Sequence, residues 1–216
     1  KIDKEGYDFI FQAGKDISAR FYDDFKKKRN LLAQNITNEI DDIQKFLIAQ
    51  KIFDRIFFIY FLCHKGIIKL DVIKKLTGEN FFNILMRQNK FFDSLKKVFI
   101  KFNSEGKERQ IELGEYSLEI PYLNGGLFRQ GVYEKQINVS LDISQWKQIF
   151  NFLNDYHWII EKINANEEHD DRILTPEILG HVYERSVVEW DLKGFEKEVI
   201  GSVTKLSERK KKGVYY

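Results

Sequence analysis

The sequence predicts a mainly α-helical, multi-helix domain with a small β-hairpin or short-strand insert around residues 109–121. Three observations support this fold class. Apolar residues recur close to the 3.6-residue helical period through most of the chain. The stretch around the insert alternates instead. Only two prolines, Pro121 and Pro176, occur in 216 residues, of which 43% are hydrophobic, enough for one compact core.

The first half of the chain is predicted to be helical. A first helix carries an apolar stripe, and its charged stretch "DDFKKKRN" is expected on the solvent face. The stripe consists of Ile17, Phe21, Phe25, Leu32 and Ile36. Residues 43–63 follow as a long, mostly apolar helix that belongs at the centre of the domain. "HKG", residues 64–66, predicts its end, because a basic residue and a glycine able to adopt positive φ are C-terminal signals.

A second amphipathic pattern runs from Phe81 to Phe102, and the alternating stretch comes after it. With Gly114-Glu115 as a two-residue turn, this stretch predicts a hairpin of defined register. The facing pairs would be Leu113 with Tyr116, Glu112 with Ser117, and Ile111 with Leu118.

Two further helices are predicted in the last third of the chain. Residues 144–163 return to helical periodicity, and the acidic loop 166–171 separates them from a helix that begins at Thr175 and Pro176. A threonine can cap that helix, and proline fits its first position. Gly180 lies inside it, where glycine costs about 1 kcal/mol against alanine. A close helix crossing would explain that glycine.

Composition excludes several function classes. The 35 basic and 33 acidic residues leave a formal net charge of +2, which predicts neither a strong polyanion binder nor an acidic tail. The single cysteine, Cys63, permits no internal disulfide and fits a cytoplasmic location. The apolar run 56–63 is far shorter than the roughly 18 residues that span a bilayer, so no membrane partner is expected.

The ends of the sequence favour a segment of a longer protein. The chain begins at Lys1 without a visible targeting leader, and its only methionine is Met86. It stops at "KKKGVYY", directly after a basic run.

Motifs for catalysis are missing from the sequence. It contains no G-x-G-x-x-G, no G-x-x-x-x-G-K-[ST] and no Pro-Pro, so neither a phosphate-binding loop nor the Asx-Pro-Pro-aromatic loop of amino-methylating enzymes is present. The histidines are scattered, and the pair Cys63-His64 has no second pair at zinc-ligand spacing. Triplets of the form (Asp/Glu)-x-Lys are expected by chance in so charged a chain. We therefore predict no catalytic residue, no metal ligand and no cofactor held by this segment alone.

Two other features could carry chemistry. Basic runs at 26–29 and 209–212 could bind phosphates, although a solvated helix face is the simpler interpretation of the first run. In "PYLNGGLF", residues 121–128, two glycines lie within apolar flanks. They predict either a tight turn anchored in the core by Leu123, Leu127 and Phe128, or a loop that lies close against a ligand.

Four stretches occur in an order that points to a known family. They are "DISARFYDDF" (16–25), "DRIFFIYFLCHKGII" (54–68), "YLNGGLF" (122–128), and "ILTPEILGHVYERSV" (173–187) followed by "ERKKKGVYY" (208–216). Together they resemble the helical region that precedes the methyltransferase domain of type IIG restriction–modification enzymes. Those enzymes fuse a DNA endonuclease to an N6-adenine DNA methyltransferase.

The resemblance implies a division of the chain. Residues 1–206 would form a helical connector domain with its small β insert at 106–128, and residues 207–216 would open a truncated methyltransferase domain. The positions that match family motifs, and so would have structural roles, are Asn124, Gly125, Gly126, Thr175, Pro176 and Gly180. The mild net charge departs from what a DNA-gripping connector would carry.

Binding roles follow from the resemblance at the carboxyl end. Gly213, Tyr215 and Tyr216 match a Gly-x-Tyr-Tyr segment that lines the S-adenosylmethionine pocket. Phosphate contacts to double-stranded DNA would fall to Arg209, Lys210, Lys211 and Lys212. The parent would use S-adenosylmethionine and a divalent metal, Mg²⁺, and would place nuclease and methyltransferase domains on either side of this segment.

Three hypotheses therefore remain open from the sequence. The chain is a connector from such a parent, without catalysis of its own. Alternatively it is a free-standing helical DNA-binding module, or a protein–protein adaptor domain with an exposed apolar patch.

Overall fold

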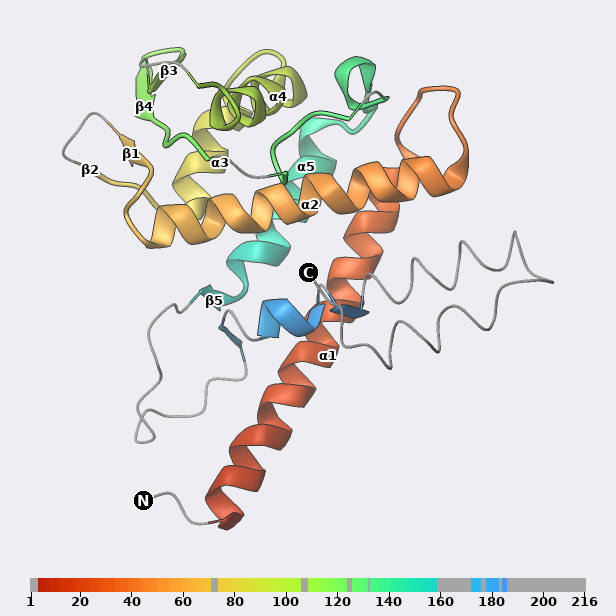
Figure 1. The fold of residues 1–216 in the computed structure, drawn as a ribbon, viewed down its shortest axis with the longest axis vertical. Coiled ribbons are helices and arrows are strands. Elements are labelled where there is room, and N and C mark those ends of the chain that lie inside the picture. Colours follow the sequence, from red (N-terminus) through yellow and green to blue (C-terminus); the bar gives the residue numbers. More distant parts are fainter. Residues whose placement is uncertain are drawn as a thin grey trace.

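The computed structural model is mainly α-helical, as the sequence predicts (Figure 1). It describes residues 4–70, 74–105, 109–123, 126–131, 133–158, 172–175, 178–182 and 184–185. The helices in those ranges are α1 (Lys4–Gln34), α2 (Asp42–His64), α3 (Gly78–Met86), α4 (Phe91–Phe102), α5 (Ile143–Asn154) and the short 3-10 helix η1 (Tyr133–Gln136). None of these helices combines the length and the apolar character needed to cross a membrane.

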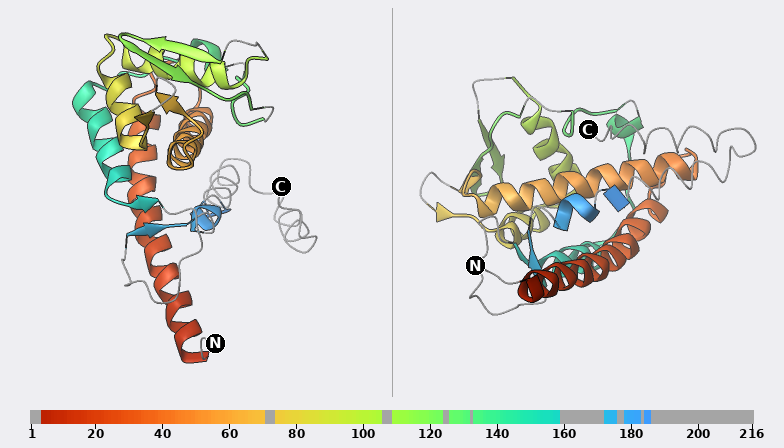
Figure 2. Two further views of the ribbon diagram at one scale, coloured as in Figure 1. Left: turned by 90° about the vertical axis from the view of Figure 1, so that its left-hand side faces the viewer. Right: turned by 60° about the horizontal axis from the view of Figure 1, so that its bottom comes forward.

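The helix α2 lies at the centre of the fold, as predicted for its sequence. Asp41 caps its start, where the carboxylate accepts a hydrogen bond from the Gln44 amide at 2.8 Å. It ends at His64, and Gly66 follows with φ +67°, so the predicted end signal is confirmed. α1 packs along α2, and α3 and α5 pack behind it (Figures 1 and 2). The N-terminal half of α1 projects beyond the other described elements.

The predicted hairpin forms in the predicted register. β3 (Gln110–Leu113) and β4 (Tyr116–Glu119) pair antiparallel, with Ile111, Glu112 and Leu113 opposite Leu118, Ser117 and Tyr116. Gly114 in the turn has φ +66°, a conformation that favours glycine. The alternating sequence pattern therefore predicts both the turn and the buried face of the hairpin correctly. On that face, Leu113 and Leu118 are almost fully buried.

Four short strands lie outside the sequence prediction. β1 (Lys69–Leu70) and β2 (Lys74–Lys75) extend the hairpin to an antiparallel sheet of order β2-β1-β4-β3. β5 (His157–Trp158) and β6 (Ile173–Leu174) form a separate parallel pair. Strands of two residues show no alternation of their own, because only the partner strand defines them.

Two predicted helices are shorter than the sequence pattern suggested. The pattern from Phe81 to Phe102 divides into α3 and α4, because the polar stretch 87–90 offers no side chain to the core. The helix expected over 144–163 ends at Asn154. Trp158 then turns back, and its indole N–H donates to the Leu153 carbonyl at 2.9 Å.

Helices α2 and α3 lie close together at Gly78, at the start of α3. A Cβ atom added there would overlap the ring of Tyr60 on α2. That ring is itself held in place, stacked on Phe82 with centroids 5.3 Å apart and on Trp158 at 5.0 Å. Its hydroxyl donates to Asn154 Oδ1 at 2.7 Å. Tyr60 cannot easily move aside, so the distance between α2 and α3 depends on the missing side chain of Gly78.

We expect Gly78→Ala to lower the free energy of unfolding by about 1–3 kcal/mol, because the methyl group overpacks a fixed aromatic stack. Gly126→Ala is the matched control. Gly126 is exposed and has no left-handed φ, and an added Cβ meets no atom within 4 Å, so alanine there should be neutral or stabilise by up to about 1 kcal/mol. Urea unfolding of both variants provides the measurement. Equal effects at the two positions would contradict the proposed close approach.

Candidate functional site: the charged network of the central helix

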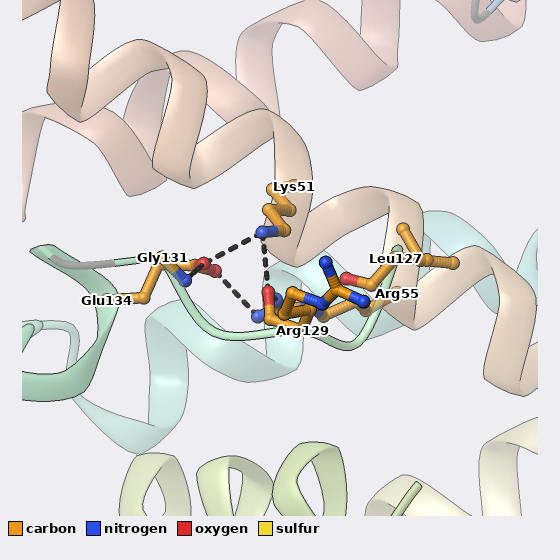
Figure 3. A network of polar contacts seen from close by, with 6 residues as sticks. All are labelled: Lys51, Arg55, Leu127, Arg129, Gly131 and Glu134. Carbon is orange, nitrogen blue, oxygen red and sulfur yellow. Dashed lines mark hydrogen bonds and ion pairs between the residues drawn. The ribbon is translucent and has the colours of Figure 1, made fainter. Parts of the chain in front are cut away.

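Arg55 is a buried charge in the middle of the apolar helix α2, with only 2% of its surface exposed. Its guanidinium faces the loop 127–131, which follows the double-glycine motif (Figure 3). Nε donates to the Leu127 carbonyl at 2.8 Å, and a terminal nitrogen donates to the Arg129 carbonyl at 3.1 Å. The other terminal nitrogen forms an ion pair with Glu134 Oε1 at 2.7 Å. All three nitrogens of one side chain are thus committed to this loop and to Glu134 of the following helix η1.

Lys51, one helical turn before Arg55, binds the same loop. Its ammonium donates to the Arg129 carbonyl at 2.7 Å and to Glu134 Oε2 at 2.9 Å. Glu134 lies in η1 and also accepts the backbone N–H of Gly131. The carboxylate therefore joins two cations of α2 to the backbone of its own loop. Charge-assisted bonds of this kind are roughly twice as strong as neutral ones, so this stretch is firmly anchored to α2.

The charges in this network stabilise one another. Burial acts to raise the pKa of Glu134, but hydrogen bonds from Lys51 and Gly131, with the charges of Arg55 and Lys51, outweigh it and lower the pKa below its ordinary value. Burial lowers the pKa of Arg55, and the charge and hydrogen bond of Glu134 oppose that effect. An arginine nevertheless stays protonated in proteins. Glu134 is thus a permanent counter-charge near neutral pH.

A second polar chain connects α2 to α1. Arg29 of α1 donates to Gln50 Oε1 at 3.1 Å, and Gln50 Nε2 donates to Asp54 Oδ1 at 2.8 Å. The guanidinium of Arg29 lies 4.1 Å from the ring centroid of Phe46 and 5.2 Å from that of Phe25. Burial raises the pKa of Asp54 to about 6, although the hydrogen bond from Gln50 and the charges of Arg29 and Arg55 act in the opposite direction.

The burial of Arg29 corrects one prediction. The basic run 26–29 was expected on a solvated face, yet Arg29 is fully buried. Its position supplies the reason, because it lies four residues after Phe25 and three before Leu32, within the apolar stripe itself. The sequence signal for this burial is an arginine at a position of the apolar stripe with aromatic neighbours, because its flat cation can stack on their rings.

The double-glycine motif is partly described. Phe128 is buried, with its ring centroid 4.5 Å from that of Phe102, and Leu123 and Leu127 pack against the core, so this anchoring is as expected. Gly126 is exposed, without a left-handed φ and with room for a side chain, so tight packing against the helices does not explain it. Asn124 and Gly125 lie outside the described residues.

The other predicted site residues lie mostly beyond the described ranges. Thr175 Oγ1 accepts a hydrogen bond from the Ile178 amide at 3.4 Å, the contact that an N-cap makes. A Cβ added at Gly180 would meet nothing within 4 Å, so the described residues provide no close crossing there. The remaining positions, outside the described part, are Pro176, Arg209, Lys210, Lys211, Lys212, Gly213, Tyr215 and Tyr216.

The chemistry available to this network is structural. The cavity beside Arg55, Lys96 and Glu134 has about 10 Å³, room for no more than one water molecule. Among the described residues, no three His, Cys, Asp or Glu side chains lie where they could hold a metal ion. Cys63 is buried, and burial raises the pKa of its thiol. These side chains fix helices and a loop, and they do not present a reactive group to a substrate.

Comparison with known proteins gives one relative. Over 155 residues, 70% of this chain, the sequence is 32% identical to a protein of Methanocaldococcus jannaschii named "Putative type II restriction enzyme and methyltransferase". The match covers 12% of that protein, so the chain spans only a small part of its relative's length. No protein-family model matches the chain, and no solved structure matches it. The chain is thus related in sequence to a restriction–modification protein.

We expect Glu134→Gln to lower the free energy of unfolding by about 3 kcal/mol or more, because it leaves the buried Arg55 without its counter-charge. Lys27→Gln is the control. Lys27 pairs with Asp24 at 3.2 Å, but the two side chains are 73% and 47% exposed to solvent, so its loss should cost less than about 1 kcal/mol. Chemical denaturation at pH 7.5 measures both. A loss at Glu134 as small as that at Lys27 would show that the network does not anchor the loop.

For Asp54 we predict the opposite of the Glu134 effect: its replacement should stabilise the protein, and by an amount that depends on pH. Because its pKa is raised in the folded protein, the folded state favours the protonated carboxyl. The contribution of Asp54 to stability is therefore present below its ordinary value of 3.8 and is lost as the pH rises through about 6. Asp54→Asn should be close to neutral near pH 4 and should stabilise the protein by on the order of 1–3 kcal/mol at pH 7.5. Unfolding curves across this pH range test it, and a constant difference would contradict the assignment.

Proposed function

We propose that this chain is a segment of a restriction–modification enzyme and that residues 1–206 act in it as a helical connector between catalytic domains. The sequence relationship to the Methanocaldococcus protein supports the first part of the proposal. The match to a small fraction of a much longer protein supports a role as one part of a larger enzyme.

The observation that carries the connector role is the anchoring of α2. Two separate polar chains, Lys51–Arg55–Glu134 on one side and Arg29–Gln50–Asp54 on the other, fix its position against the loop 127–131 and against α1. Apolar packing alone resists sliding only weakly, whereas hydrogen-bonded charges fit one register. A domain built in this way can hold its neighbours at a constant distance and angle.

The reactions belong to other parts of the parent enzyme. In this proposal the parent methylates adenine N6 in double-stranded DNA with S-adenosylmethionine and cleaves DNA with Mg²⁺. Gly213, Tyr215 and Tyr216 would begin the S-adenosylmethionine pocket, which the methyltransferase domain after them completes. The described carboxylates do not gather into a metal-binding group, so the Mg²⁺ ligands would come from a flanking nuclease domain.

DNA contacts in this segment would be confined to its last basic run. Arg209, Lys210, Lys211 and Lys212 could each neutralise a phosphate, and each such contact adds about 0.9 to the slope of log affinity against log salt. The rest of the segment is close to electrical balance. A free-standing DNA-binding module would instead show a steep salt dependence by itself.

We expect the purified 216-residue chain to show neither methyl transfer nor DNA cleavage, while the parent enzyme shows both. Transfer of a labelled methyl group to duplex DNA and gel analysis of cleavage measure the two reactions, and turnover by the chain alone would refute the connector role. In the encoded protein, Thr-Pro after Tyr216 and a later Asn-Pro-Pro-aromatic loop should be present. Replacing Lys210, Lys211 and Lys212 by glutamine in the parent should reduce its salt slope by up to about 2.7.

A further inference from the structure

One face of α2 is only partly covered by the other described elements. On it, Lys51 binds Glu134 of η1 and the Phe61 ring lies 5.3 Å from that of Trp158, while two large apolar side chains stay exposed. Every third or fourth residue faces this side, so the positions form a single stripe along the helix. The stripe, called here the open face, consists of Leu47, Lys51, Asp54, Phe58, Phe61 and Lys65. Leu47 is 37% exposed and Phe58 is 36% exposed, in a helix that is otherwise buried on most sides. Figure 1 shows α2 passing in front of α3 and α5, which lie on its other side.

The double-glycine loop borders this open face. The ring of Phe128 lies 6.0 Å from that of Phe58, and Arg55 holds the neighbouring Leu127 carbonyl. Gly126, two residues before Phe128, is exposed and has both an ordinary φ and space for a side chain. Nothing in the described fold therefore requires a glycine there. A backbone that approaches from outside would require one, because a glycine lets another chain come close.

The charges on the open face limit what can cover it. Asp54 lies in the middle of the stripe, between Leu47 and Phe58, and is half-buried beside Gln50. Lys51 is already paired with Glu134, and Lys65 lies at the far end of the stripe. A DNA phosphate beside Phe58 would therefore be repelled by the Asp54 carboxylate and would gain nothing from the aromatic side chains. An apolar helix with a basic residue at the level of Asp54 would cover Leu47 and Phe58 and would add to the charges of Arg29 and Arg55 that this carboxylate already faces. α2 has 23 residues, about 35 Å, which suits another helix lying along it.

We propose that the open face of α2, with Gly126 and Leu127 at its border, is the docking surface for an amphipathic helix from another part of the same parent polypeptide. This proposal rests on the proposed function, since it takes the occupant from the parent enzyme. The match covers only 12% of the relative, so most of such a parent lies outside this segment. The docked helix would transmit the fixed orientation of α2 to the neighbouring domain.

Thiol labelling can test this surface. The native Cys63 is buried and should react too slowly to interfere. Phe58→Cys places a reporter on the open face, and Ile100→Cys is a matched control on α4, where Ile100 is 46% exposed. Both variants are made in the 216-residue chain and in the parent enzyme, and circular dichroism verifies that they fold. A maleimide dye should label Phe58→Cys at least tenfold more slowly in the parent than in the chain, and Ile100→Cys equally in both.

Other occupants give different results, which would overturn the proposal. Slow labelling of Phe58→Cys in the dilute chain would mean that the chain covers its own open face. Labelling that slows as the chain concentration rises would identify a second copy as the occupant. Equal rates in chain and parent would show that nothing docks there. Adding Gly126→Val should restore fast labelling of Phe58→Cys in the parent while leaving the stability of the chain within about 1 kcal/mol.

The two proposals fail in distinguishable ways. A parent that protects Phe58→Cys but neither methylates nor cleaves DNA would refute the proposed function and leave the docking surface in place. A parent with both activities and an unprotected Phe58→Cys would refute the docking surface alone.

Discussion

The structure depends on one buried charge, the guanidinium of Arg55. A buried arginine is tolerated only when its donors find acceptors and its charge finds a partner. Two backbone carbonyls and Glu134 meet that requirement, and all three belong to a segment more than 70 residues away in the sequence. The loop 127–131 and Glu134 must therefore follow the side of α2 in one register. Phe128 then enters the core beside Phe102, so the anchoring of the loop and the packing of the core depend on each other.

The sequence predicted those elements whose causes are local. α2, its end at Gly66 and the hairpin around Gly114 follow from periodicity, a positive-φ glycine and alternation within a few residues. β1 and β2 were missed because only the pairing with β4 makes strands of them. The division between α3 and α4 was not predicted because the polar stretch 87–90 is short. The apolar residues before and after it keep the same helical period, so the pattern looks continuous.

The polar network of Arg55 could not be predicted from the sequence, for a physical reason. Arg55 donates to main-chain carbonyls. Every residue carries such a carbonyl, so no residue type in the sequence indicates where the acceptors lie. The motif around Gly125 and Gly126 indicates the correct loop. Tight packing is the reason that the sequence suggests for these glycines, but Gly126 is not tightly packed. The residue whose missing side chain does permit close packing is Gly78, which no motif marked.

The two polar chains also explain why a connector would retain costly buried charges. Replacing an ion pair by apolar residues often leaves stability unchanged or improves it, so stability alone does not favour Arg55 and Glu134. A helix held only by apolar side chains can, however, repack with its neighbour shifted by a turn, because many arrangements bury similar areas. Arg55 and Arg29 oppose such shifts on two sides of α2, since each shift would leave a buried cation without its acceptors. The same shift would move Phe58 and Asp54 relative to the loop, so the charges that fix α2 also fix the geometry of the face it presents.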